Sequence, residues 1–264
     1  MDISVVIPLY NEAESLPELF AWIERVMKEH NFSYEVIFIN DGSTDNSWEV
    51  IEALKSKNPE VVHAVKFRRN YGKSPGLNCG FQRAKGDVVI TMDADLQDDI
   101  NVIDRFVEKY MEGCDVVYGV RNKRETDTFF KRTTAEGFYK FMKILGVDVV
   151  FNHADYRLMS RRALEGLSEY KEVNLFLRGI VPLIGFKSDY VYYDRAERFA
   201  GESKYPLKKM ISFALDGITS FSVKPLKLIP NLGILISVLS IFGLLYALIS
   251  HLCGVTVAGW TAIV

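Results

Sequence analysis

Residues 88–97 read VVITMDADLQ, an apolar run that ends in three oxygen-bearing side chains, those of Asp93, Asp95 and Gln97. The run predicts a buried strand, and side chains two positions apart on an extended chain share one face. Two carboxylates and an amide oxygen, with no nearby His or Cys, suit a hard cation such as Mg²⁺ or Mn²⁺. The alternative is that these acids only end the strand and begin a helix.

Two other predicted strands lead into polar segments. Residues 36–39 precede Asn40-Asp41-Gly42-Ser43, in which Ser43 is a candidate helix cap, and residues 3–7 precede Pro8-Leu9-Tyr10-Asn11-Glu12. Strands that alternate with helical stretches predict an α/β fold with a mainly parallel sheet, whose ligands bind at the carboxyl ends of the strands. We therefore expect the three polar segments to form one nucleotide site.

The coarse order of elements follows from apolar periodicity and turn residues. The predicted strands are residues 3–7, 36–39, 61–67, 87–92, 115–120 and 188–193, the last as an edge strand. The predicted helices are residues 13–29, 44–57, 76–84, 100–111, 129–145, 160–167 and 175–184.

The polar segments together resemble the family 2 glycosyltransferases, which have the GT-A fold. The resemblance rests on Pro8-x-Tyr10-Asn11-Glu12, Asp41-Gly42-Ser43 and Asp93-Ala94-Asp95-Leu96-Gln97-Asp98. The subgroup that it resembles is the polyprenyl-phosphate glycosyltransferases, which include dolichyl-phosphate mannosyltransferase and undecaprenyl-phosphate glucosyltransferases. That likeness rests on Arg198, residues 201–205 (GESKY), residues 222–226 (SVKPL) and a hydrophobic tail.

The resemblance implies a site for a nucleotide sugar. Mg²⁺ or Mn²⁺ would be held on its diphosphate by Asp93, Asp95 and Gln97. Its base and ribose would be bound by Pro8, Tyr10, Asn11, Glu12 and Asp41. Asp41 has an alternative role, because Asp-Gly pairs commonly form turns. The chain departs from the family at Asp98-Asp99-Ile100, where Asp-Pro-Pro is usual, and this leaves an extra carboxylate near the metal.

Two arginines follow the predicted strand 115–120. Arg121 and Arg124 would add fixed positive charge at the diphosphate, for which a planar guanidinium is well suited. The alternative is that each forms a surface ion pair with Glu125 or Asp127.

The acceptor implied by the resemblance is polyprenyl phosphate. Its second pKa lies near ~6, so it is largely dianionic at neutral pH and needs cations more than it needs a general base. Arg198, Ser203 and Lys204 would bind this phosphate, with attraction to bilayer head groups as the alternative. Asp155 matches a family position near the reaction centre and is the candidate base, or it orients Arg157 through a buried ion pair. The implied catalytic residues are Asp95, Asp155 and Arg124.

The carboxyl-terminal part of the chain is apolar. No Asp, Glu, Lys or Arg occurs from Leu228 to Val264, and residues 232–250 alone approach the length of about 20 residues that a membrane helix needs, which predicts a first helix over residues 232–252. A buried core helix is the alternative. We expect a catalytic domain over 1–200, a juxtamembrane amphipathic segment over 201–227 and a membrane region over 228–264, in which the chain stops inside a second helix.

The charge distribution and the composition predict the cellular location of the chain and exclude some classes of partner. Residues 195–227 contain seven Lys or Arg against three Asp or Glu, although the whole chain has a net charge of -2. The local excess predicts contact with anionic lipid, and the positive-inside rule places the catalytic domain on the cytoplasmic side of the plasma or inner membrane. The amphipathic helix would lie on the bilayer or against the catalytic domain. The overall charge excludes a globally basic nucleic-acid binder, and three scattered cysteines indicate neither a zinc site nor a disulfide framework.

The expected activity is inverting transfer of a hexose, with UDP-glucose as donor and undecaprenyl phosphate as acceptor, by a homo-oligomer. GDP-mannose with dolichyl phosphate is the alternative substrate pair. A processive polysaccharide synthase is disfavoured because such enzymes usually carry a Gln-x-x-Arg-Trp element, and Trp22, Trp48 and Trp260 lie in none. A non-enzymatic scaffold is disfavoured because Asp93, Asp95 and Gln97 of the acidic motif are all present. Tyr71-Gly72-Lys73-Ser74 is set aside as a phosphate loop, since Phe67 stands where that motif needs glycine.

Overall fold

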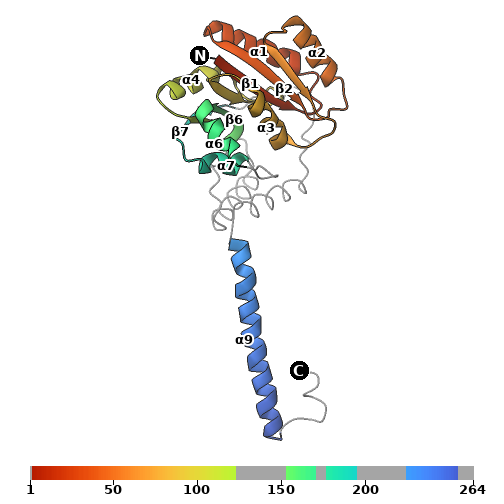
Figure 1. Ribbon diagram of the computed structural model, residues 1–264, viewed down its shortest axis with the longest axis vertical. Helices are drawn as coiled ribbons and strands as arrows, with labels where there is room; N and C mark the ends of the chain where they lie inside the picture. The colour runs from red at the N-terminus through yellow and green to blue at the C-terminus, as the bar shows by residue number, and fades with distance from the viewer. Residues whose placement is uncertain (1, 123–152, 171–176, 195–223, 255–264) are drawn as a thin grey trace.

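The computed structural model describes residues 2–122, 153–170, 177–194 and 224–254. They form a layered α/β domain and one long helix, α9 (Lys224–Leu252), that extends away from it (Figure 1). The predicted helix 129–145 and the predicted interfacial helix lie outside the described residues.

A seven-stranded sheet lies at the centre of the domain, in the spatial order β3-β2-β1-β4-β6-β5-β7. Its strands are β1 (Asp2–Leu9), β2 (Ser33–Asn40), β3 (Val62–Lys66), β4 (Val88–Thr91), β5 (Val116–Arg121), β6 (His153–Ser160) and β7 (Ser188–Tyr193). Neighbouring strands are parallel except that β6 is antiparallel to both β4 and β5. The predicted α/β fold with a mainly parallel sheet is therefore confirmed.

Helices cover both faces of the sheet. One face packs against α1 (Leu16–Glu29), α2 (Ser47–Lys57) and α4 (Ile103–Met111), the last preceded by the 3₁₀ turn η1 (Ile100–Val102). The other face packs against α3 (Lys73–Arg83), α6 (Arg161–Ser168) and α7 (Leu177–Leu183). Along β1, Val5 and Ile7 belong to the first core and Val6 to the second, as the two-residue period of a strand requires.

Strand β6 was not predicted from the sequence. Its residues 155–158 read Asp-Tyr-Arg-Leu, so charged side chains interrupt the apolar pattern that marks a buried strand. Both charged residues are nevertheless buried, Asp155 at 8% and Arg157 at 1% exposure. The strand is held by pairing with β4 on one side and β5 on the other, which is long-range information.

Several element boundaries differ from the predictions. The predicted cap at Ser43 is wrong, because α2 begins at Ser47 after Asn46, and the Ser43 hydroxyl accepts the backbone N–H of Asn11 instead. Helix α3 begins at Lys73, three residues before the predicted start. The predicted edge strand 188–193 is confirmed as β7, at one end of the sheet.

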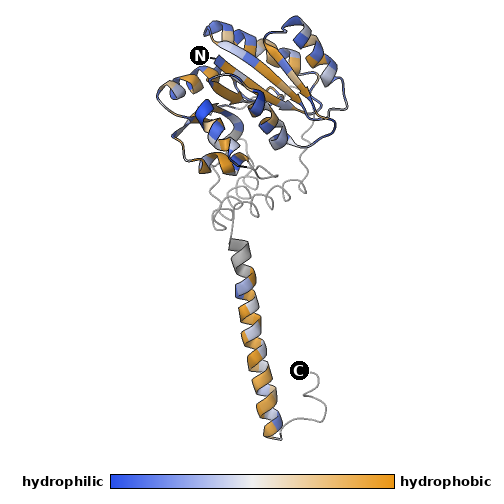
Figure 2. Ribbon diagram, in the orientation of Figure 1, coloured by the Kyte–Doolittle hydropathy of each residue, from blue (hydrophilic) through white to orange (hydrophobic). Residues whose placement is uncertain are grey.

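Helix α9 is largely apolar from Ile229 onward (Figure 2). Its segment Ile229–Leu252 has 24 residues, and an 18-residue window within it has a mean hydropathy of 2.5 and no buried residue. At 1.5 Å per residue this segment is about 36 Å long, enough to cross a hydrocarbon core of about 30 Å. The alternative of a buried core helix is therefore wrong, and α9 is a candidate membrane span.

Candidate active site

The loop after β1 is hydrogen-bonded to the loop after β2 at the carboxyl edge of the sheet. The backbone N–H of Asn11 donates to the Ser43 hydroxyl at 3.0 Å, and that of Glu12 donates to the Ser47 hydroxyl at 3.0 Å. In return, Asn11 Oδ1 accepts the N–H of Thr44 at 2.8 Å. Asn11 adopts φ +55°, a left-handed conformation that Asn tolerates better than most residues. Two of the predicted polar segments are thus joined.

Within the segment after β1, Pro8 and Tyr10 differ in accessibility. Tyr10 is 36% exposed, whereas Pro8 is buried within β1 beside Gly76 of α3, where a Cβ on the glycine would lie 3.3 Å from the proline ring. Of the two, only Tyr10 offers its side chain to a ligand.

Asp41 follows β2 and organises the loop that leads into α3. Its Oδ1 accepts the N–H of Tyr71 at 2.7 Å and its Oδ2 accepts the N–H of Gly72 at 2.8 Å. Burial raises the pKa of Asp41 and outweighs the two hydrogen bonds, which lower it. Gly42 has φ +70°, and a Cβ on it would lie 2.5 Å from the carbonyl carbon of Arg69. Each Asp41 oxygen still has a lone pair for a ligand.

Residues 93–97 form a turn, so the predicted extended arrangement of the acidic motif is wrong. Strand β4 already ends at Thr91, and Leu96 adopts φ +58°. Through this turn Asp95 Oδ1 accepts the N–H of Gln97 at 3.3 Å, and Gln97 is 8% exposed. A positive φ at a branched apolar residue is rare, and such strain often occurs at functional sites. The turn, rather than strand alternation, brings Asp95 and Gln97 together.

Lys73 joins two of the predicted carboxylates, although the sequence analysis set its segment aside. Its Nζ pairs with Asp93 and with Asp155, the latter at 2.8 Å. Burial lowers the pKa of Lys73, but the charges of Asp155 and Asp93 outweigh it and raise the pKa above its usual value. The signal that could have found Lys73 is its place after the predicted strand 61–67, at the same edge of the sheet as the other motifs.

Asp155 is paired with three cations. Besides Lys73, Arg157 Nη2 donates to it at 2.8 Å, and Arg178 donates through Nε at 3.1 Å and Nη2 at 3.0 Å. Burial would raise the pKa of Asp155, but the charges of Lys73, Arg178 and Arg157 hold it well below its usual value. A carboxylate with so low a pKa is a weak proton acceptor at neutral pH. The buried ion pair with Arg157, weighed as the alternative to a base, is present.

The contact between Arg178 and Asp155 could not be predicted from the sequence, because only the folded structure brings helix α7 next to β6. Arg157 has a different peculiarity, since its Nη1 has no hydrogen-bond partner among the described residues although the side chain is 1% exposed. The carboxylate of Asp155 is therefore the main compensation for a fully buried guanidinium.

Arg121 pairs with Asp98. Its Nη2 lies 3.3 Å from Asp98 Oδ1, and the hydroxyl of Tyr193 donates to the same oxygen. Burial and the charge of Asp93 raise the pKa of Asp98, against the opposing charge of Arg121. The surface ion pairs considered for Arg121, with Glu125 or Asp127, involve residues outside the described ranges and stay a prediction.

Asp99 is the extra carboxylate at the departure from the family pattern. It accepts the N–H of Asn101 at 3.0 Å and so begins η1, while its backbone carbonyl accepts the hydroxyl of Tyr156 at 3.0 Å. Asp99 thus has a local structural role. Four other predicted site residues lie outside the described residues: Arg124, Arg198, Ser203 and Lys204.

The residues of the acidic turn fit a divalent cation shared between protein and phosphate. Within the described ranges, no three His, Cys, Asp or Glu side chains form a group that could hold a metal by themselves. Mg²⁺ commonly takes only one or two carboxylates and completes its shell with water and phosphate oxygens. Asp93 has a side chain that is 28% exposed and already binds a cation, the ammonium of Lys73. Asp95 and Gln97 supply further oxygens from the same turn.

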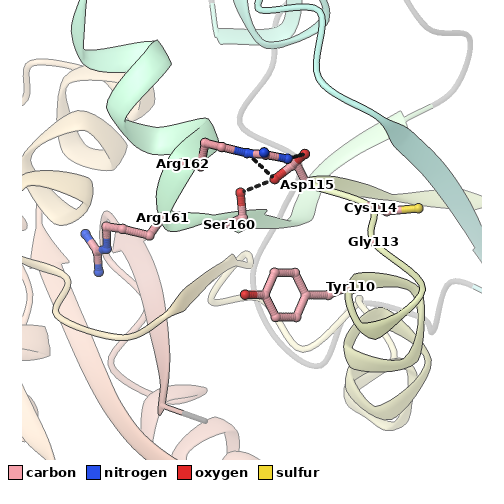
Figure 3. A pocket seen from close by; sticks show the side chains of 7 residues that line it. All are labelled: Tyr110, Gly113, Cys114, Asp115, Ser160, Arg161 and Arg162. Carbon is pink, nitrogen blue, oxygen red and sulfur yellow. Dashed lines mark hydrogen bonds and ion pairs between the residues drawn. The ribbon is translucent and has the colours of Figure 1, made fainter.

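A separate cavity of about 410 Å³ lies at the opposite edge of the sheet (Figure 3). It opens beside Asp115, which precedes β5, and Ser160, which ends the antiparallel β6. Both oxygens of Asp115 are engaged, because Arg162 donates to each and the Ser160 hydroxyl donates to one at 2.8 Å. Because Asp115 is engaged by Arg162 and Ser160, and the cavity lies at the edge of the sheet opposite the acidic turn, it is not the candidate site.

Comparison with known sequences identifies close relatives. Residues 4–168 match the family model described as "Glycosyl transferase family 2". The chain is 49% identical to the "Uncharacterized glycosyltransferase YkoT" of Bacillus subtilis, over 99% of this chain and 80% of that protein. It is 41% identical to the "Prophage bactoprenol glucosyl transferase homolog" of Escherichia coli, over 100% of this chain and 86% of that protein.

Solved structures share the fold. Mannosyl-3-phosphoglycerate synthase from Rubrobacter xylanophilus superposes with a TM-score of 0.57 at 12% identity, over 84% of this chain and 73% of that one. Glucosyl-3-phosphoglycerate synthase from Mycobacterium tuberculosis, in complex with Mn²⁺, UDP-glucose and phosphoglyceric acid, gives a TM-score of 0.54 at 17% identity, over 83% of this chain and 78% of that one. At such low identity these likenesses establish the architecture alone.

Proposed function

This chain belongs to glycosyl transferase family 2, and we propose that it transfers glucose from UDP-glucose to a polyprenyl phosphate at a membrane surface. The observation that carries the proposal is the likeness to the bactoprenol glucosyl transferase homolog of Escherichia coli, which spans the whole chain and therefore includes both the acidic turn and α9. Family membership and these relatives make the chain a hexosyltransferase.

The donor would bind at the carboxyl edge of β1, β2 and β4. Its base and ribose would contact Asp41 and the exposed Tyr10. Asn11 and Glu12 would hold the loop after β1 in place through their hydrogen bonds, and the buried Pro8 would pack beneath that loop. The diphosphate would lie over the acidic turn, where Asp93, Asp95 and Gln97 would hold Mg²⁺ or Mn²⁺. When bound, that ion supplies a Lewis acid for the negative charge that develops on the departing diphosphate. Arg121 and Arg124 would add positive charge beside it.

The acceptor chemistry needs no strong base. A polyprenyl phosphate is mostly dianionic at pH 7, so one of its oxygens can attack the anomeric carbon as the bond to the diphosphate breaks, with inversion of configuration. Asp155 would then act as an organiser that holds Lys73, Arg157 and Arg178 in fixed positions, a role supported by its three ion pairs and lowered pKa.

Docking of the lipid would take place beside the membrane. Arg198, Ser203 and Lys204 would bind its phosphate, and α9 would anchor the enzyme in the bilayer. The excess of Lys and Arg over residues 195–227 supports a cytoplasmic position of the catalytic domain, because such residues are retained on that side.

The test is a measurement of UDP release by the purified full chain in detergent, with and without undecaprenyl phosphate, in Mn²⁺ and in EDTA. The proposal predicts release from UDP-glucose that is stimulated by the lipid and abolished by EDTA. A lack of lipid stimulation with every common nucleotide sugar, GDP-mannose included, would contradict it. Stimulation by an oligosaccharide instead would indicate a polysaccharide synthase.

The lipid site has its own test in Lys204→Ala. Loss of this ammonium should raise the KM for the lipid phosphate by about tenfold and leave the KM for UDP-glucose nearly unchanged, since one charge-assisted contact contributes about 1.5–3 kcal/mol. Lys208→Ala is the matched control, since Lys208 lies in the same basic segment, 195–227, and is not a proposed ligand of the lipid phosphate. Equal effects of the two substitutions, or equal losses for lipid and nucleotide sugar, would remove Lys204 from the acceptor site.

A further inference from the structure

The ammonium of Lys73 pairs with two carboxylates, and the proposed function assigns no role to its contact with Asp93. Lys73 is the first residue of α3, and it reaches Asp93 after β4 and Asp155 in β6. Its side chain is 30% exposed and that of Asp93 is 28% exposed, whereas Asp155 is 10% exposed. The contact between Lys73 and Asp93 therefore lies at the accessible part of the site, where a ligand would enter.

The two carboxylates depend on Lys73 to very different degrees. Asp155 has two further cations, Arg157 and Arg178, at 2.8 to 3.1 Å. For Asp93, Lys73 is the one cation with which it is paired in the part of the chain that the structure describes. Asp155 would thus keep two cations without Lys73, whereas Asp93 would lose its one ion-pair partner among the described residues.

An ammonium and a divalent ion cannot both occupy the accessible side of one carboxylate without strong mutual repulsion. Asp93 precedes Asp95 and Gln97 in the turn that would hold the ion, so the ion would have to take the place of the ammonium. Lys73 would keep its second contact, with Asp155, and its flexible four-carbon stem allows the charge to turn towards a neighbouring anion.

We propose that Lys73 is a resident counterion of the metal site. In the ligand-free enzyme its ammonium is paired with Asp93, and the divalent ion displaces the ammonium from Asp93 when a diphosphate binds. This inference rests on the proposed function, because it assumes an ion at Asp93. Phosphate oxygens offer the displaced ammonium a new partner, so the ion and the nucleotide bind cooperatively. By linkage, the factor by which UDP raises the affinity for the ion equals the factor by which the ion raises the affinity for UDP. Lys73 is in this sense a positioning residue that keeps the ion from binding firmly without a nucleotide.

The test is the affinity for Mn²⁺ itself, measured by electron paramagnetic resonance of free Mn²⁺ on the full chain in detergent, with and without UDP. In Lys73→Met the affinity without UDP should rise by about tenfold or more, because a competing charge is gone. The increase caused by UDP should become smaller than in the wild type. Lys85→Met is the matched control, since Lys85 is exposed and lies before β4, at the opposite edge of the sheet. It should leave both affinities unchanged.

Failures of the inference and of the proposed function give different results. If the wild type binds Mn²⁺ and Lys73→Met binds it with equal or lower affinity, the resident-counterion role is refuted while the metal site stands. If the wild type binds no Mn²⁺ even with UDP, the metal site of the proposed function is refuted, and this inference with it. Lys73→Gln provides a second variant in case Lys73→Met does not fold, and thermal unfolding in EDTA verifies folding of each. The glutamine variant, which also lacks the charge, should show the same rise in Mn²⁺ affinity.

Discussion

Replacing Asp155 by asparagine should destabilise the folded protein strongly. The change removes the carboxylate that compensates Arg157, whose side chain is 1% exposed and whose Nη1 has no hydrogen-bond partner among the described residues. Removing one partner of a buried ion pair costs about 3–5 kcal/mol, because an uncompensated charge remains buried. Lys73 and Arg178 are partly exposed and add little to this figure. In a chain of this size about 1 kcal/mol shifts Tm by about 2–4 °C, so Tm should fall by about 6–20 °C.

The assay is thermal unfolding of the full chain in detergent, followed by circular dichroism. Asp189→Asn is the matched control, because Asp189 forms an exposed pair with Lys109 at 3.1 Å, worth about 0–1 kcal/mol. The double variant Asp155→Asn/Arg157→Met removes the buried charge together with its partner and should recover most of the lost stability. A Tm of Asp155→Asn within about 2 °C of the wild type would refute the reasoning, as would a double variant no more stable than the single one.

Three further predictions concern the acidic turn, the loop after β2 and acid stability. Asp95→Ala should lower turnover by about 100-fold or more without changing Tm, because it removes a proposed ligand of the ion, and near-normal turnover would exclude that role. Gly42→Ala should cost about 1–3 kcal/mol in chemical denaturation, since φ is +70° and the added Cβ would meet the Arg69 backbone; an unchanged midpoint would contradict this. Burial raises the pKa of Asp115, but hydrogen bonds from Arg162 and Ser160 and the charge of Arg162 together lower it by more, so the pKa in the folded state lies below its usual value. The contribution of ionised Asp115 to folding stability is therefore present above the unfolded pKa of ~3.9 and lost as pH falls through the folded value. Asp115→Asn should cost about 1–2 kcal/mol of folding stability at pH 7 and progressively less below about pH 4. A difference in Tm that stays constant into acid would refute that assignment.

The position of the site was predictable because it follows from elementary rules. Apolar runs followed by Asp41 or Asp93, and separated by helical stretches, imply parallel strands whose carboxyl ends meet at one edge. The structure places the loops after β1 and β2 in direct contact and Asp93 at the same edge. The apolar tail was equally plain, since a long uncharged run has few alternatives to a membrane helix.

What the sequence did not reveal depends on contacts between distant residues. Strand β6 carries the charged residues Asp155 and Arg157 at buried positions, and charged residues in a sequence argue against a buried strand. Only the structure shows that the two are paired with each other and can therefore be buried. Lys73 and Arg178 reach Asp155 from helices that lie 82 and 23 residues away along the chain. The left-handed conformation of Leu96 was also beyond prediction, because leucine has no preference for it and only the surrounding packing holds it there.

The central claim is that the acidic turn serves the transfer of one glucose to a lipid phosphate at the bilayer. Its most direct test is mass spectrometry of the lipid recovered after the full chain, in vesicles that contain undecaprenyl phosphate, is incubated with UDP-glucose and Mn²⁺. We expect a lipid heavier by a single hexose, of inverted anomeric configuration, and no such product in EDTA. Sugar recovered only as polymer or as free glucose, with the lipid unchanged, would contradict it.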